Sequence, residues 1–154
     1  MKILKAIVPL ICFSLLVSCS DNKTLKSDTI KNSTARIAIL KKHIKPYSEI
    51  KDAEFYLFNS DGFDGGPTLG LGPADINYDF VVKVNPLEIN KWKQNLIETT
   101  GGFEYERLKS LTEKRAQNWI TSSKPKFYKD KDIETSLVII FEEEGIVYEQ
   151  INLN

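Results

Sequence analysis

One segment of the chain, residues 59–79, concentrates acidic and amide side chains of the kinds that bind cations or transfer protons. The candidates in chain order are Asn59, Asp61, Asp64, Asp75 and Asp79. A pair of carboxylates can serve as the general acid and base of a hydrolase, and one member of such a pair would titrate with a raised pKa. The segment also contains a long glycine-rich stretch, and long loops without secondary structure are often functional. We therefore predict a binding loop here, with a hydrolase acting on peptidoglycan or lipid as the alternative function.

The spacing within this loop completes no familiar ligand motif. A Walker-type phosphate loop would need lysine and then serine or threonine where Leu71 and Gly72 stand. An EF-hand beginning at Asn59 would place Phe63 at a ligand position and Gly70 where a bidentate glutamate is required. Asx turns explain the polar side chains better than calcium does. We therefore expect no cofactor and no metal site.

The rest of the chain offers few other groups for catalysis. It has two cysteines, Cys12 and Cys19, and one histidine, His43, which we expect to be solvated on the polar face of a helix. This inventory excludes a multi-histidine metal site. Ser123 and Lys126 have the serine-to-lysine spacing of penicillin-recognising enzymes, but the intervening proline would break the helix that this chemistry needs. The residues favour a non-enzymatic protein.

The N-terminus carries the clearest signal in the sequence. Lys2 and Lys5 precede an apolar run from Ala6 to Val17. This run is too short to span a bilayer as a lasting anchor, and the charged residues before it are typical of a secretion signal. We therefore predict that the chain is exported.

The run ends in Leu16-Val17-Ser18-Cys19, which resembles the lipobox of bacterial lipoproteins. The resemblance implies that the peptide before Cys19 is removed and that this cysteine is acylated, which would attach the protein to a membrane through lipid. Ser20 follows the cysteine, where inner-membrane lipoproteins of Gram-negative bacteria usually have aspartate. The resemblance therefore implies the periplasmic face of the outer membrane in a Gram-negative cell. Processing would also leave no free thiol for a disulfide or a zinc site.

These features divide the chain into a cleaved signal peptide over 1–18, a lipidated cysteine with a flexible tether over 19–33, and a globular domain over 34–154. The mature chain would have 136 residues and a net charge near −2. Its first part, 19–45, has a net charge of +5, whereas the remainder has −7. An acidic exported domain is a poor nucleic-acid binder. The expected partners are the membrane, through Cys19, and an envelope protein or cell-wall ligand, as for an immunity- or inhibitor-type protein.

Hydropathy patterns and capping residues predict the elements that must position these groups. They are a helix over 33–45, strands over 51–59 and 78–84, a helix from Asn85 to before 101, a helix from Ser110 to before 125, and strands over 135–141 and 146–153. Trp92 and Trp119 lie at helical spacing and are expected in the core. The pattern indicates one α+β domain, in which an antiparallel sheet of about four strands from two hairpins carries two or three helices on one face.

Overall fold

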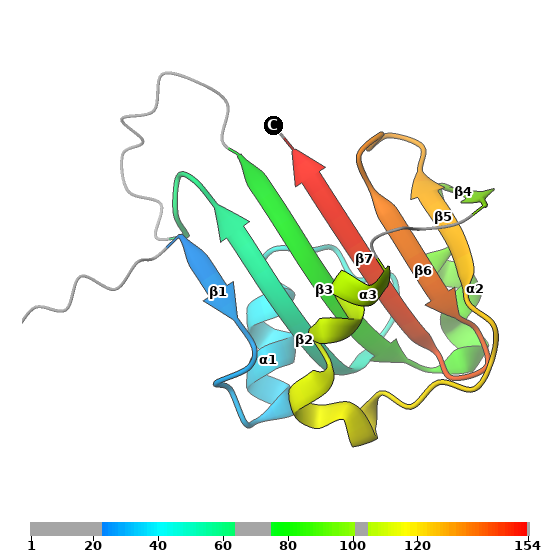
Figure 1. Cartoon of the computed structure of the whole chain (residues 1–154), viewed down its shortest axis with the longest axis horizontal. Coiled ribbons are helices and arrows are strands. Elements are labelled where there is room, and N and C mark those ends of the chain that lie inside the picture. Colours follow the sequence, from blue (N-terminus) through cyan, green and yellow to red (C-terminus); the bar gives the residue numbers. More distant parts are fainter. Residues whose placement is uncertain (1–22, 64–74, 101–104, 154) are drawn as a thin grey trace, which may run out of the picture.

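The computed structural model describes residues 23–63, 75–100 and 105–153. Within these ranges, seven strands form one antiparallel sheet in the order β1-β2-β3-β7-β6-β5-β4 (Figure 1). The strands are β1 Thr24–Lys26, β2 Ile50–Asn59, β3 Ile76–Val84, β4 Leu96–Thr99, β5 Lys126–Asp130, β6 Leu137–Phe141 and β7 Ile146–Leu153. The predicted single α+β domain with an antiparallel sheet is confirmed.

The two predicted hairpins form the centre of this sheet. In the first, β2 pairs with β3, and Phe55 lies opposite Phe80. In the second, β6 pairs with β7 through a turn at Gly145, whose φ of 65° suits glycine. A Cβ at Gly145 would lie 2.5 Å from the carbonyl oxygen of Val84, so a side chain has no room there. Pairing of β3 with β7 joins the two hairpins.

The predicted number of strands is wrong, because three further strands extend the sheet at its edges. β1 lies inside the segment predicted to be a flexible tether and pairs with β2, so the folded domain includes residues before 34. β4 occupies the end of a predicted helix. That helix ends early because Asn95 has a φ of 66°, which no α-helix residue adopts, and β4 then pairs with β5.

The helices are shorter than predicted. They are α1 Ser33–Leu40, the 3-10 helix η1 Pro86–Glu88, α2 Ile89–Trp92, α3 Tyr105–Ser110 and the 3-10 helix η2 Glu113–Asn118. The predicted cap at Asn85 is confirmed, because its Oδ1 accepts the backbone N–H of Leu87 at 3.2 Å. The predicted helix start at Ser110 is wrong. Ser110 ends α3, and its hydroxyl donates to the carbonyl oxygen of Arg107 at 2.6 Å.

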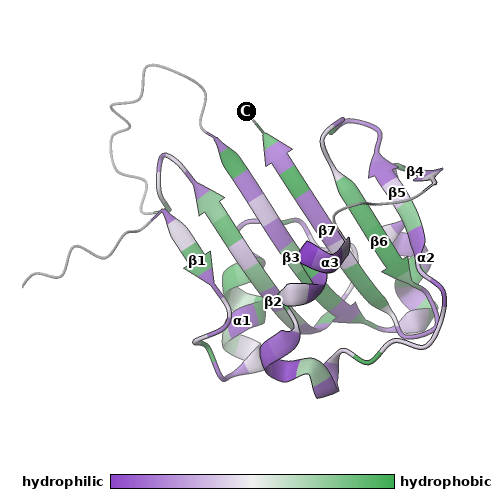
Figure 2. Cartoon of the chain, in the orientation of Figure 1, coloured by the Kyte–Doolittle hydropathy of each residue, from purple (hydrophilic) through white to green (hydrophobic). Residues whose placement is uncertain are grey.

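Helices cover both faces of the sheet, not the one face that we predicted (Figure 1). α1 and α2 pack on one face, here called the α1/α2 face, and α3 and η2 pack on the other, the α3/η2 face. Both tryptophans are buried as predicted, Trp92 on the first face and Trp119 on the second. Figure 2 shows that β6 is hydrophobic along its length. A strand whose two faces are both covered reads as such a continuous apolar run.

Among the described residues, no helix has both the length and the apolar character needed to cross a membrane.

Candidate functional site

The structure separates the acidic residues that the sequence groups together. Asn59 ends β2, and its Oδ1 accepts the backbone N–H of Asp61 at 3.0 Å, in the expected Asx turn. Asp75 lies near it, because its carbonyl oxygen accepts the backbone N–H of Ser60 at 3.0 Å. Asp61 and Asp75 are both exposed, and Asp64 lies outside the described residues.

Asp79 is different, because it points to the α3/η2 face and is only 4% exposed. Its two carboxylate oxygens accept hydrogen bonds from the two terminal nitrogens of Arg107 on α3. A bidentate arginine pair of this kind positions α3 against the sheet. Asp79 therefore has a structural role, which is to hold α3 against the sheet.

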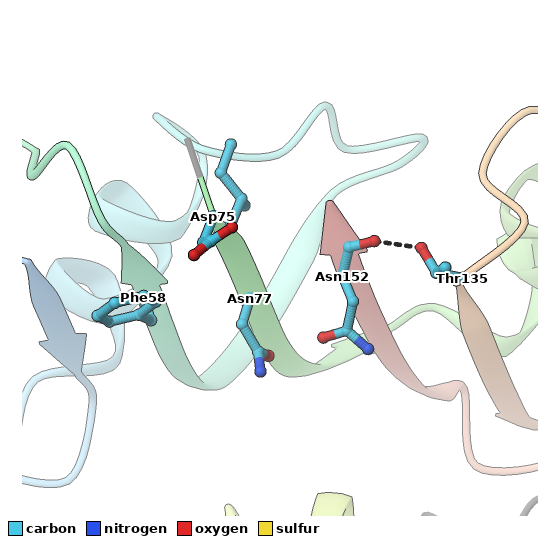
Figure 3. Close-up of a pocket in the computed structure, with 6 residues that line it drawn as sticks. Phe58, Asp75, Asn77, Thr135 and Asn152 are labelled. Atoms are coloured by element: carbon cyan, nitrogen blue, oxygen red, sulfur yellow. Dashed lines mark hydrogen bonds between the residues drawn. The ribbon is translucent and has the colours of Figure 1, made fainter. Parts of the chain in front are cut away.

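A shallow depression of about 480 Å³ lies at the end of the sheet where Asp75 is found. It is lined by Phe58, Asp75, Ile76, Asn77, Thr135 and Asn152. Figure 3 shows Phe58 on β2, Asn77 on β3 and Asn152 on β7, with the hydroxyl of Thr135, in the segment before β6, donating to the carbonyl oxygen of Asn152. Of the described residues that line the depression, Asp75 alone is acidic, so these residues provide no pair of carboxylates.

A second cavity, of about 190 Å³, lies on the α1/α2 face and combines carboxylates with aromatic rings. We call it the Glu149 cavity. It is lined by His43, Ile44, Lys45, Tyr47, Phe80, Trp92, Asp130, Ile133, Glu149 and Ile151. These residues come from the loop after α1, the centre of β3 and β7, α2, and the end of β5 with its following turn. Sequence reasoning did not find this site.

Strand alternation places Glu149 on the floor of this cavity. In β7, Val147 belongs to the core of the α1/α2 face and Tyr148 to the core of the α3/η2 face. Because side chains alternate along a strand, Glu149 points to the same face as Val147. It lies opposite Phe80 on β3 and Val138 on β6, both of which are buried and apolar.

Within the described part of the chain, the carboxylate of Glu149 has neither a hydrogen bond nor an ion pair. Its removal from solvent raises its pKa to about 7, and the negative charge of Asp130 acts in the same direction. Burial of an unpaired carboxylate is costly, and proteins retain such groups mainly at functional sites. Near neutral pH, Glu149 exists both as an acid and as a carboxylate.

The second carboxylate of the cavity, Asp130, is fixed by its own turn. Its Oδ1 accepts the backbone N–H groups of Asp132 at 2.7 Å and Ile133 at 3.2 Å. This anchoring holds the Asp130 side chain at the rim of the site instead of leaving it to rotate freely.

The aromatic wall is also held in place. The indole N–H of Trp92 donates to the hydroxyl of Ser48 at 2.8 Å, and the ring of Tyr47 meets the Trp92 ring edge-on with centroids 5.4 Å apart. Desolvation raises the pKa of Tyr47, and the charges of Glu149 and Asp130 add to this increase. Tyr47 therefore stays a neutral phenol at physiological pH.

His43 lies beyond the end of α1 and lines the cavity, whereas the sequence predicted a solvated position on a helix. Its ring packs against the rings of Phe63 and Tyr78, with centroid distances of 4.8 and 6.1 Å. Desolvation lowers its pKa, as does the nearby charge of Lys42. His43 is therefore uncharged at neutral pH and does not neutralise Glu149.

The arrangement presents hydrogen-bond acceptors and negative charge inside an aromatic and aliphatic enclosure. Groups of three or more side chains suited to hold a metal ion are not found among the described residues. The only signal in the sequence was a glutamate at an inward-facing position of β7, which alternation alone cannot distinguish from an outward one. No protein family, curated protein or solved structure matches this chain.

Proposed function

We propose that this protein is a lipid-anchored binding module of the bacterial cell envelope, and that its domain holds a ligand in the Glu149 cavity without chemically changing it. The anchor rests on the lipobox-like residues 16–19 and on acylation of Cys19. In a Gram-negative cell the module would face the periplasm from the outer membrane. The observation that carries the binding function is the unpaired carboxylate of Glu149 inside a cavity.

The unpaired carboxylate of Glu149 makes ligand binding energetically favourable. The carboxylate of Glu149 loses hydration on the apolar face of the sheet, and the surrounding described residues donate no hydrogen bond to it. A ligand that donates hydrogen bonds to Glu149 would recover part of this free energy on binding. The rings of Tyr47 and Trp92 and the aliphatic side chains around them would bury the remainder of the ligand.

The anchor is tested by replacing each cysteine in turn. We expect that Cys19→Ala abolishes the lipid mass increment and membrane association, because it removes the acylated thiol. The matched control is Cys12→Ala, which lies in the predicted signal peptide and should leave both unchanged. Intact mass spectrometry and membrane fractionation of the full chain expressed in a Gram-negative host provide the measurement. Unlipidated wild-type protein would refute the anchor.

The binding function is tested by screening small charged and neutral compounds against the processed, purified protein. We expect that some of them raise the melting temperature of the wild type, because ligands that bind only the folded state stabilise it. The same compounds should have no effect on Glu149→Gln. As a control, Asp75→Asn changes the acid at the other depression and should respond like the wild type. A screen without any Glu149-dependent binder would refute the function.

A second candidate function is hydrolysis, and one observation favours it. Glu149, with a pKa of about 7, fits a general acid, and Asp130 is a neighbouring carboxylate. The reaction class is the one predicted from the sequence, but the site is the Glu149 cavity and not residues 59–79. Release of soluble products from peptidoglycan or phospholipid by the wild type, and not by Glu149→Gln, would establish it in place of passive binding.

A further inference from the structure

We propose that the ligand of the Glu149 cavity is an alkylammonium group, the positively charged end of a small amine or of a lysine side chain. This inference rests on the proposed binding function and names its ligand class. It depends on the charges that face the cavity, on the aromatic rings around it, and on its size.

The charges that face the cavity favour a cation. Glu149 on β7 and Asp130 on β5 are acidic, and Tyr47 and His43, both from the loop after α1, are neutral at physiological pH. The remaining charged group among the described lining residues is Lys45, whose side chain is exposed. A carboxylate only accepts hydrogen bonds, so the ligand must supply the donors. An ammonium group supplies both donors and positive charge.

The aromatic rings favour an organic cation over a bare metal ion. Trp92, Tyr47 and Phe80 line the site together, and the face of an aromatic ring attracts a cation, with tryptophan the strongest. The methylene groups next to an ammonium would pack on the same rings and on the isoleucines. A hydrated metal ion would gain nothing from these apolar contacts.

The size of the cavity limits the ligand. Its volume of about 190 Å³ lies below the roughly 300 Å³ at which pockets for drug-sized molecules begin. A chain of a few carbons with one ammonium group fits this space, whereas a nucleotide or an oligosaccharide does not. An alcohol of the same length would leave the charge of Glu149 uncompensated, and a carboxylic acid anion would be repelled by it.

Calorimetric titration with matched probes tests the ligand class. The probes are n-butylammonium, 1-butanol and butyrate, which share a carbon chain and differ in charge. They are titrated into the processed protein in nonionic detergent at pH 8. We expect saturable binding of n-butylammonium and at least roughly tenfold weaker binding of the other two. Equal binding of 1-butanol would overturn the inference, as would preferential binding of butyrate.

The pH dependence adds a second readout. Glu149 must be ionised to pair with an ammonium group, and its pKa is about 7. Affinity for n-butylammonium should therefore fall by roughly tenfold or more between pH 8 and pH 5, while the amine itself remains protonated. The pKa of His43 is lowered, so any positive charge that it gains belongs to the acidic end of this range and acts in the same direction. Affinity that does not change with pH would contradict the assignment.

Two variants connect the binding to the cavity. Glu149→Gln preserves the shape of the side chain and should abolish both the binding and its pH dependence. Tyr47→Leu removes one aromatic ring at a position that is 40% exposed, and it should weaken binding severalfold without unfolding the protein. The control is Glu143→Gln, an exposed glutamate in the β6–β7 turn, which should bind as the wild type does. Undiminished binding by Glu149→Gln would place the amine elsewhere and refute the proposal.

The outcomes separate this inference from the proposed function. If n-butylammonium does not bind but another compound of the screen binds in a Glu149-dependent manner, the ligand class is wrong and the binding function stands. If nothing binds, both fail. A final probe, lysine blocked at its α-amino and carboxyl groups, distinguishes the sources. Binding as tight as that of n-butylammonium indicates a lysine of a protein or peptide, and much weaker binding indicates a free amine.

Discussion

The two faces of the sheet hold their inward-facing carboxylates in opposite ways. On the α3/η2 face, Glu54 and Asp79 are nearly inaccessible to solvent, and each meets an arginine from the layer above it. On the α1/α2 face, Glu149 is half-buried opposite the apolar side chains of Phe80 and Val138, and it meets no arginine among the described residues. A buried carboxylate with an arginine partner holds structure together, whereas one without a partner, facing a cavity, is available to a ligand.

Glu54 shows how thoroughly the structure can pair a buried charge. Its Oε1 accepts a hydrogen bond from Nε of Arg115 at 2.5 Å, and its Oε2 accepts one from a terminal nitrogen of the same arginine at 2.7 Å. Oε2 also accepts a hydrogen bond from the hydroxyl of Ser27 at 2.6 Å. Arg36, only 1% exposed, approaches Oε1 at 3.5 Å and pairs with Asp52. The cluster connects α1, β2 and η2 around one edge of the sheet.

The apolar residues are distributed unevenly between the faces as well. Among the residues that the structure describes, the core of the α1/α2 face has twice as many buried side chains as that of the α3/η2 face, fourteen against seven. The smaller core is supplemented by ion pairs and by a hydrogen bond from Lys83 to the carbonyl oxygen of Asn118. We infer that ion pairs do more to position the α3/η2 layer, whereas the α1/α2 layer depends more on apolar burial, with Arg36 as its charged contact at the edge of the sheet.

The largest effect should come from breaking the best-paired carboxylate. We expect Glu54→Gln to lower the free energy of unfolding by about 3 to 5 kcal/mol, because it leaves the guanidinium group of Arg115 without its counter-charge and leaves Arg36 with Asp52 alone. Urea denaturation at neutral pH measures the change. Glu113→Gln, which alters an exposed glutamate on η2, should stay within about 0.5 kcal/mol of the wild type. A comparably small loss for Glu54→Gln would contradict the structural role assigned to the network.

Removing the charge of the unpaired carboxylate, Glu149, should increase the stability of the protein instead of lowering it. We expect Glu149→Gln to raise the free energy of unfolding by about 1 to 3 kcal/mol at pH 8, because ionised Glu149 is partly removed from water and has no partner. The folded pKa of about 7 exceeds the unfolded value of 4.5, so the wild type loses stability as the pH rises between these values. The gain should therefore disappear near pH 4.5.

Urea titrations at several pH values measure this gain, with Glu143→Gln as the control. A variant that is less stable than the wild type at pH 8 would mean that Glu149 has a partner in solution, and the contrast between the two faces would fail.

A smaller loss should follow when the more exposed ion pair is broken. We expect Asp79→Asn to cost about 1 to 2 kcal/mol, less than Glu54→Gln, because the Arg107 side chain is 41% exposed and can regain water. Asp75→Asn, in the exposed depression, should cost almost nothing. Urea denaturation measures the free energy of unfolding of both variants. An equal loss of stability in the two would show that Asp79 does not fix α3.

The sequence predicts the centre of the fold well because the signals there are local. Alternating side chains and a glycine turn identify the β6–β7 hairpin, and the same alternation identifies β2 and β3. The edge strands lack such signals. β4 continues a helical pattern formed by Ile89, Trp92 and Leu96, and only the conformation of Asn95 and the pairing with β5 reveal a strand. Pairing between distant segments is not visible in a local pattern.

The functional residues were harder to predict for a related reason. Asp61 and Asp75 attracted notice because they cluster in sequence, yet the structure leaves both exposed. Glu54 and Glu149 are isolated polar residues in apolar strands, where alternation predicts that they point to solvent. Both faces of this sheet are covered, so Glu54 is buried and Glu149 is only partly exposed. What distinguishes Glu54 from Glu149 is the arginine supplied by another element, and no single segment contains that information.

Glu144 is a third kind of carboxylate, paired by hydroxyl and backbone N–H groups instead of an arginine, and its replacement has the smallest expected effect. Partial burial opposes ionisation of Glu144, but hydrogen bonds from the hydroxyl and backbone N–H groups of Ser122 and Ser123 outweigh it and lower its pKa to about 2. Because the folded pKa lies below the unfolded value, its contribution is complete above about pH 4.5 and disappears as the pH falls through 2. We expect Glu144→Gln to cost about 1 kcal/mol at pH 7 and almost nothing at pH 2. Urea denaturation at the two values measures this. An effect independent of pH would mean that shape alone, and not the charge, holds the segment after η2 to the β6–β7 turn.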